Sequence, residues 1–238
     1  MEKKYSYEEL VSIISKLRSE EGCPWDREQT HTTLIPCLLE ESYELMEALQ
    51  NNDMKLMKEE LGDVLLQIIM HSQIAKEENE FSIDDVINDL ATKLVYRHPH
   101  VFKDTKVKDV EEVLKNWEEL KKDEKNEKTL VESMDRVAKT LPSLIRSQKV
   151  QKKAIKSGDL NNDTVSTIEQ IKSLLENFEN KDKTLEKQEK SELMGELLFN
   201  IVKISTFFDI NPEIALTKSV EKFINRFRYI ENSRVNKD

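Results

Sequence analysis

Two segments, LLEESYELMEAL (residues 38–49) and ELGDVLLQII (residues 60–69), decide the fold of this chain. Leucines and isoleucines recur in both at the spacing of an apolar helix face, which predicts two helices with a buried side. Acidic residues accompany each apolar face, and they stand three positions apart. Residues at that spacing share one side of a helix, so each helix is expected to present a pair of carboxylates.

The paired acids are Glu41 with Glu44 and Glu60 with Asp63. Two antiparallel helices joined by a short loop would bring all four together. A carboxylate buried without a partner is costly, so four of them predict a bound cation. Because the donors are hard oxygens and no cysteine lies among them, Mg²⁺ is favoured, with Mn²⁺ as an alternative.

Two other interpretations of the acids stay open. Most helix carboxylates form a solvated face, and these four would do so if their side of the helices were exposed. A di-iron carboxylate bundle also gathers glutamates, but it requires a Glu-x-x-His pattern. No histidine stands three residues after any of these glutamates, so a magnesium site fits the spacing better.

Composition limits the class of protein. Only four Gly and five Pro among 238 residues leave few turns for a β-rich fold, so we expect an all-α protein. A net charge of −10 argues against nucleic acid as a partner. Two cysteines, Cys23 and Cys37, are too few for a disulfide framework, and no apolar run is long enough to cross a membrane. The start of the chain lacks a signal peptide, so a cytoplasmic location is predicted.

Periodicity and breakers predict helices along the whole chain, and the segment 22–31, which contains Gly22 and Pro24, is read as an ordered loop. A run without apolar residues, 121–128, predicts a linker, and it divides the chain into domains 1–125 and 126–238. The helices are expected over residues 7–18, 34–50, 54–76, 82–97, 110–122, 131–157 (with an interruption at Pro142 left open), 164–178, 187–208 and 212–230.

The second half repeats the first. The segment 60–69 aligns with LMGELLFNIV (residues 193–202), and KLVYR (93–97) aligns with KFINR (222–226). Two copies indicate a duplicated helical unit rather than a solenoid. Only one acid survives at the four positions of the second copy, which predicts a degenerate metal site there; these positions are Gln170, Ser173, Leu193 and Glu196.

Cationic and aromatic residues supply candidates for ligand binding. Lys93 and Arg97 stand one helical turn apart, where they could hold phosphate oxygens beside a metal site. Trp25 and Trp117 are the only tryptophans, and each could pack in a core or stack on a nucleobase. Lys121 follows Trp117 by one turn and could meet phosphate.

Taken together, the motifs resemble the MazG family of all-α nucleoside triphosphate pyrophosphohydrolases. The resemblance covers nearly the whole chain, and it rests above all on CPWD (23–26) and RHPHVF (97–102), with QTH (29–31) and ELGD (60–63). It implies tandem helical bundles completed by homodimerisation. It further implies magnesium-dependent hydrolysis of nucleoside triphosphates, canonical or aberrant, to a nucleoside monophosphate and pyrophosphate.

The resemblance also implies roles for individual residues. The metal ligands would be Glu41, Glu44, Glu60 and Asp63, and the nucleotide contacts would be Lys93, Arg97, Trp117, Lys121 and Trp25. Glu40 stands beside the ligands and is a candidate to orient or deprotonate the attacking water, although an exposed, uninvolved glutamate is equally compatible with its position. The degenerate second copy keeps an alternative open, a catalytically weak nucleotide-binding or regulatory helical module.

Overall fold

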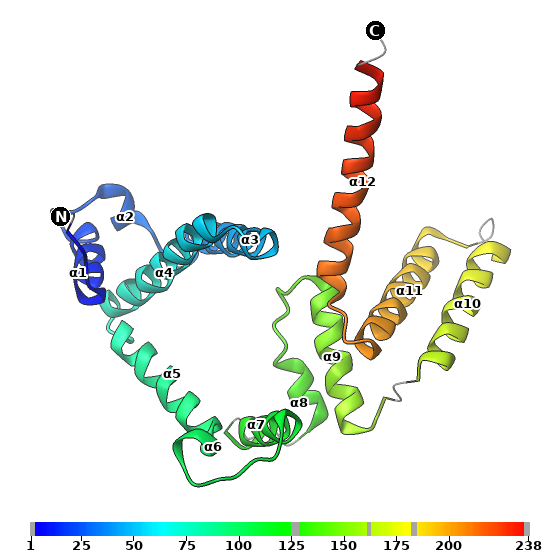
Figure 1. The fold of residues 1–238 in the computed structure, drawn as a ribbon, viewed down its shortest axis with the longest axis horizontal. Helices are drawn as coiled ribbons and strands as arrows, with labels where there is room; N and C mark the ends of the chain where they lie inside the picture. The colour runs from blue at the N-terminus through cyan, green and yellow to red at the C-terminus, as the bar shows by residue number, and fades with distance from the viewer. Residues whose placement is uncertain (1–2, 125–128, 161–162, 182–184, 236–238) are drawn as a thin grey trace. The chain divides into compact units, whose positions relative to one another are not determined.

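A computed structural model describes residues 3–124, 129–160, 163–181 and 185–235, and every regular element in these ranges is a helix (Figure 1). The predicted all-α class is confirmed. The chain divides into two compact units, Met1–Lys121 and Lys122–Asp238. Residues 125–128 of the predicted linker lie outside the described ranges. None of the described helices is long and apolar enough to cross a membrane.

Unit 1 is built around a helical hairpin. Its two arms are α3 (Ile35–Asn51) and α4 (Met54–Glu77), which make the most extensive helix pair among the described helices. The N-terminal helix α1 (Tyr7–Leu17) packs across α4. Helix α5 (Ile83–Arg97) follows the C-terminal end of α4 and contacts that helix. The remaining helices are α2 (Pro24–Glu28), α6 (Pro99–Phe102) and α7 (Val110–Glu124), the last of which extends past Lys121, where unit 1 ends.

The core of unit 1 forms where α1, the start of α3 and the second half of α4 meet. Its fully buried side chains are Ile14, Leu34, Ile69, Met70 and Ile74. Helix α4 as a whole is less buried than its sequence indicates. Its apolar residues on all sides predict a buried helix, but Leu61 is 52 % exposed and Ile68 is 43 % exposed, so that expectation is wrong for one face.

The segment 22–31 is not a plain loop, because α2 forms within it. Pro24 sits at the first turn of α2, where its missing N–H costs nothing. Gly22 closes the turn after α1, and a Cβ there would collide with the backbone carbonyls of Lys16 and Leu17. The short helix α6, which follows His98, was also not predicted. Its start at Pro99 follows the same first-turn preference for proline.

Unit 2 repeats the hairpin. Its arms are α10 (Thr164–Lys181) and α11 (Lys187–Phe207), and α9 (Ser143–Ser157) packs against α11 as α1 packs against α4. Helices α8 (Leu130–Asp135) and α12 (Pro212–Val235) both contact α9. The single helix considered over 131–157 is therefore interrupted, because α9 begins only after Pro142.

Candidate metal and nucleotide site

The turn between α3 and α4 sets how their acids face each other. Asn52 closes α3 in the left-handed conformation with φ of 53°, which asparagine tolerates better than most residues. Asp53 then caps α4, since its carboxylate accepts hydrogen bonds from the backbone N–H of Lys55 and Leu56, both at 3.0 Å. A tight turn of this kind makes the helices antiparallel neighbours.

Three of the four predicted ligands come together across this hairpin. Glu41 of α3 and Glu60 and Asp63 of α4 each offer one carboxylate oxygen, and these atoms all lie within 4.8 Å of one another. Glu60 is only 5 % exposed, and its Oε2 has no hydrogen-bond partner. A buried anion without a donor is unfavourable, so this arrangement needs a proton or a cation to be stable.

The pKa values of Glu60 and Glu41 reflect the same unfavourable burial of charge. Burial raises the pKa of Glu60 above its ordinary value, and the charges of Glu44, Asp63 and Glu41 raise it further. Burial likewise raises the pKa of Glu41, followed by the charges of Asp63, Glu44 and Glu40. Like charges held this close disfavour simultaneous ionisation, and a divalent cation between them reverses that cost.

The donor set fits a hard divalent cation. All three clustered donors are carboxylate oxygens, and the described part of this cluster contains no thiol or imidazole. Gln67, one turn beyond Asp63 on α4, is also buried, and its Oε1 has no partner. Unsatisfied buried oxygens beside the cluster match ligands or water-holding groups of a metal site rather than a solvated helix face.

Glu44 and Glu40 lie at the margin of the cluster. Both are exposed on α3, and neither belongs to the set whose oxygens lie within 4.8 Å. The charge of Glu44 nevertheless acts on both Glu60 and Glu41, and the charge of Glu40 acts on Glu41. They are therefore near enough to influence the clustered acids electrostatically.

A second cluster gathers three of the predicted nucleotide contacts. The Cζ atom of Arg97 lies 5.3 Å from the ring centre of Trp117, and Nζ of Lys121 lies 4.8 Å from it. Arg97 closes α5 and is buried, whereas Trp117 and Lys121 are half-buried on α7. Two cations on one indole are a cation–π arrangement that concentrates positive charge at this point of unit 1.

Lys93 and Trp25 stand apart from these clusters. Lys93 is exposed on α5, and Trp25 is 60 % exposed on α2. No described side-chain contact joins either residue to the acids or to the Trp117 cluster. Trp25 is therefore not a core residue.

The degenerate copy in unit 2 forms an open pocket instead of an acid cluster. This pocket has a volume of about 650 Å³ between α10 and α11, and three of the four aligned positions line it, Leu193 being the exception. Among the described residues of its wall, Glu196 is the one acid. The lining residues are Gln170, Ser173, Leu174, Gly195, Glu196, Phe199 and Asn200.

Sequence reasoning missed two polar pairs that anchor other segments to α4. His31 contacts His71, and Arg18 forms an ion pair with Glu77 at 2.7 Å while it also donates to the carbonyls of Asp26 and Gln29. His31 belongs to the QTH segment, which was recognised as a motif but given no role. The arginine gave no local signal, because its partners lie up to 59 residues away.

Comparison with known proteins places the chain in a family. A sequence profile described as the MazG nucleotide pyrophosphohydrolase domain matches residues 29–102, which hold the acid cluster, Lys93 and Arg97. The chain is 43 % identical over 225 residues to the nucleoside triphosphate pyrophosphohydrolase/pyrophosphatase MazG of Thermotoga maritima, covering 94 % of this chain and 85 % of that protein. The chain therefore belongs to the MazG family of nucleotide pyrophosphohydrolases.

Two further relatives differ in how much of their length is matched. The nucleoside triphosphate pyrophosphohydrolase of Escherichia coli K12 is 37 % identical over 227 residues, which cover 93 % of this chain and 86 % of that protein. The uncharacterised protein YabN of Bacillus subtilis is 46 % identical over 239 residues, covering 98 % of this chain but 48 % of YabN. The similarity thus spans both units of the chain.

Proposed function

We propose that the protein hydrolyses nucleoside triphosphates, canonical or aberrant, to a nucleoside monophosphate and pyrophosphate, and that it needs Mg²⁺ or Mn²⁺. The observation that carries the proposal is the cluster of Glu41, Glu60 and Asp63 around a buried, unpartnered carboxylate oxygen. Relatives over nearly the whole chain bear the name of this activity. A metal held there would neutralise triphosphate charge and lower the pKa of a coordinated water.

The remaining roles, which are cation binding, water activation and phosphate binding, fall to residues of the chain. The three clustered acids hold the cation, and Glu44 adds charge at their margin. Glu40 orients the attacking water or takes its proton, because it stands next to Glu41 and is exposed to solvent. Lys93 and Arg97 hold phosphate oxygens and offset charge on the leaving pyrophosphate.

The base and sugar are proposed to meet the aromatic residues. Trp117 offers its ring beside Arg97 and Lys121, so a base that stacks there lies next to positive charge for its phosphates. Trp25 offers a second, exposed ring on α2. Both roles follow the family's motif positions.

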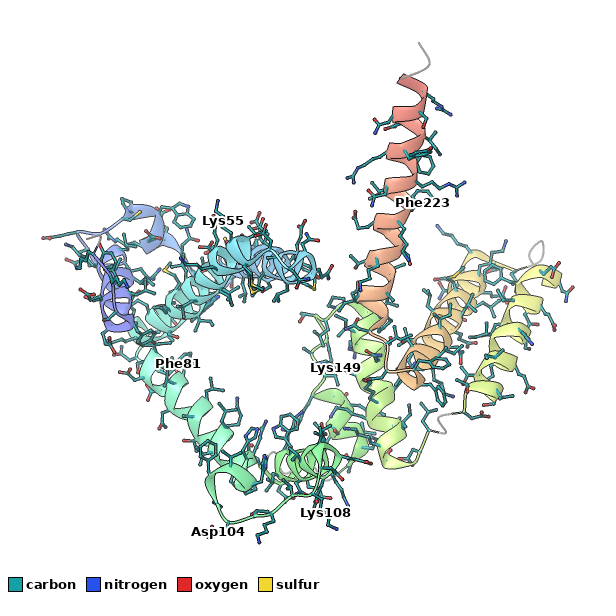
Figure 2. All side chains as sticks on the ribbon, in the orientation of Figure 1. Lys55, Phe81, Asp104, Lys108, Lys149 and Phe223 are labelled. Carbon is teal, nitrogen blue, oxygen red and sulfur yellow. The ribbon has the colours of Figure 1, made fainter. Side chains whose placement is uncertain are left out.

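We further propose a homodimer. The described residues of both units expose many large apolar side chains. Leu61 on α4 is 52 % exposed, and Phe223 on α12, which is labelled in Figure 2, is 62 % exposed. A second copy of the chain would cover such faces.

We also propose a cytoplasmic location for the protein. The free thiols of Cys23 and Cys37 suit a reducing compartment.

A second candidate is a nucleotide-binding or regulatory module with little turnover. The open pocket of unit 2 favours it, since among its described lining residues Glu196 is the one acid, where unit 1 has a cluster. Phosphorus NMR of purified protein with nucleoside triphosphate and Mg²⁺ separates the candidates. Hydrolysis is supported if monophosphate and pyrophosphate appear together and if neither product appears when a chelator is present. Unchanged triphosphate under saturating Mg²⁺ would reject it.

A further inference from the structure

The two histidines of unit 1 that approach each other are joined edge to edge. Nδ1 of His31 lies 2.8 Å from Nδ1 of His71, and the ring planes differ by only 7°. The ring centres are 5.1 Å apart, which is the separation of two coplanar rings meeting through these nitrogens rather than of two stacked faces. One ring must therefore donate an N–H and the other must accept it, so at least one histidine is neutral.

The surroundings indicate which ring donates. Nε2 of His31 lies 3.8 Å from Oε2 of Glu78, so the carboxylate favours a proton on that nitrogen. His31 then accepts at Nδ1, and His71 donates from its Nδ1. Burial lowers the pKa of His71, and the neighbouring His31 lowers it further, so His71 favours the neutral form, which can donate from Nδ1 as its Nδ1–H tautomer.

The pair lies at the open end of the α3–α4 hairpin. At one end, Asn52 and Asp53 tie α3 to α4 through the covalent turn. At the other end, the chain enters α3 from the 29–34 segment, and His31 bonds to α4 there. The clustered acids lie between the two ties, with Asp63 about two helical turns before His71 and Glu41 about two turns after Leu34.

Apolar packing alone does not set this register. Leu34 packs with Ile69, Met70 and Ile74 at the same end, but hydrophobic contact is non-directional and tolerates sliding. A hydrogen bond between two rings fixes both distance and angle. A shift of one residue along a helix moves a side chain by about 1.5 Å, whereas Mg²⁺ demands near-ideal octahedral geometry.

We propose that His31 and His71 are a positioning pair that holds α3 in register against α4, so that Glu41 meets Glu60 and Asp63 around the metal. The role rests on the metal site of the proposed function. The pair acts through the helices and touches neither metal nor nucleotide. Substituting it should weaken metal binding in the free protein, before any nucleotide is present.

Electron paramagnetic resonance of Mn²⁺, titrated into the full-length protein without nucleotide, measures this directly. His71→Phe keeps a ring but removes the hydrogen bond, and it should raise the Mn²⁺ Kd on the order of tenfold or more, as loss of a supporting partner does. His71→Asn places an amide N–H near the position of Nδ1 and should retain most of the wild-type affinity. His31→Ala truncates a side chain that is 44 % exposed, so it keeps the fold and should weaken Mn²⁺ as His71→Phe does.

Matched controls separate register from general loosening. Glu77→Gln breaks the ion pair with Arg18 on the same end of α4 without touching α3, and it should leave the Mn²⁺ Kd unchanged. The double variant His31→Ala/His71→Phe should bind Mn²⁺ no more weakly than the weaker single variant. Unchanged affinity in His31→Ala, equal weakening by Glu77→Gln, or additive losses in the double variant would each overturn the positioning role.

Asp63→Asn distinguishes a failure of this role from a failure of the proposed function. It should abolish Mn²⁺ binding at the cluster while leaving the histidine pair intact. If Asp63→Asn binds Mn²⁺ as tightly as wild type, the metal assignment itself is wrong, and the positioning role falls with it. If Asp63→Asn loses the ion but the histidine variants do not, only the positioning role is wrong.

Discussion

Glu41 of α3 and Glu60 of α4 present carboxylate oxygens within 4.8 Å of each other from opposite arms of one hairpin. Glu60 has no hydrogen bond to its buried Oε2, so nothing in the described part of the protein balances its charge at that atom. Two ionised carboxylates at this distance repel each other. The hairpin thus carries an electrostatic cost that ion binding can remove.

This cost makes the stability of the metal-free protein depend on pH. The pKa values of Glu60 and Glu41 are raised by folding, so protonation favours the folded state. Their stabilising contribution is present below the unfolded-state pKa of about 4.3 and is lost as the pH rises through the higher folded-state values. Urea unfolding in a chelator should therefore show wild type losing more stability than Glu60→Gln between about pH 4 and about pH 7.

Added Mg²⁺ should reverse this trend. The thermal midpoint should rise with Mg²⁺ at neutral pH, and the rise should shrink as protons compete for the same carboxylates in acid. Glu60→Gln should show a much smaller rise at neutral pH. An equal midpoint shift in wild type and Glu60→Gln would contradict a metal site at this cluster.

Glu44 is expected to matter less than the clustered acids. It is exposed and lies outside the group of close oxygens, although its charge acts on Glu60. Glu60→Gln should lower kcat/KM for triphosphate hydrolysis by roughly a hundredfold or more, and Glu44→Gln by roughly tenfold. Steady-state kinetics at saturating Mg²⁺ compares them, and equal losses would make Glu44 a full ligand.

Unit 2 is expected to bind no catalytic metal. Glu196 is the one acid among the lining residues that the structure describes, and the other aligned positions in the wall, Gln170 and Ser173, bring no charge. Glu196→Gln should leave kcat/KM nearly unchanged. A large loss of turnover in a variant that remains folded, judged by circular dichroism, would show that unit 2 takes part in catalysis.

The ion pair of Arg18 and Glu77 gives an independent test of the fold. Burial alone raises the pKa of Glu77, but hydrogen bonds from Arg18 and Gln73 outweigh it and leave the pKa below its ordinary value. The pair's stabilisation is therefore present at neutral pH and lost as the pH falls through that lowered value. Glu77→Gln should cost about 1 kcal/mol of unfolding free energy at neutral pH, because Glu77 is partly exposed, and progressively less in acid. A cost that persists unchanged in strong acid would contradict the assignment.

The exposed apolar faces predict assembly. Light scattering of the full-length protein should give twice the chain mass of 27.9 kDa. Replacing Leu61 and Ile68 on the exposed face of α4 by glutamate should lower that mass, since charged residues oppose burial at an interface. A fully active wild-type monomer would reject the dimer.

Local sequence signals were enough to predict most helices and the meeting of three acids. The segment Asn51–Asp53 breaks the helical pattern and ends α3, and Ser82 with Asp85 forms the capping box that starts α5. Each of these two helix ends is therefore encoded within a few residues. The acids could be predicted because a three-residue spacing fixes their helix face. Glu44 shares that spacing, yet its exposure depends on where α4 packs.

Other features depend on distant contacts and could not be predicted in this way. Apolar residues on every side of α4 indicated burial, but the chain by itself does not cover Leu61 or Ile68. The Arg18–Glu77 pair joins residues 59 positions apart, which no local pattern reports. The histidine pair joins positions 40 apart, so only the fold reveals why His31 stands in its segment.

The central claim is that the acids of the α3–α4 hairpin bind the metal that hydrolysis requires. Pyrophosphate release from nucleoside triphosphate, measured across a Mg²⁺ titration for wild type and Asp63→Asn, tests it most directly. The account predicts metal-dependent release in wild type and a loss of roughly a hundredfold or more in Asp63→Asn, with the fold preserved. Equal pyrophosphate release by the two proteins over the whole titration would contradict it.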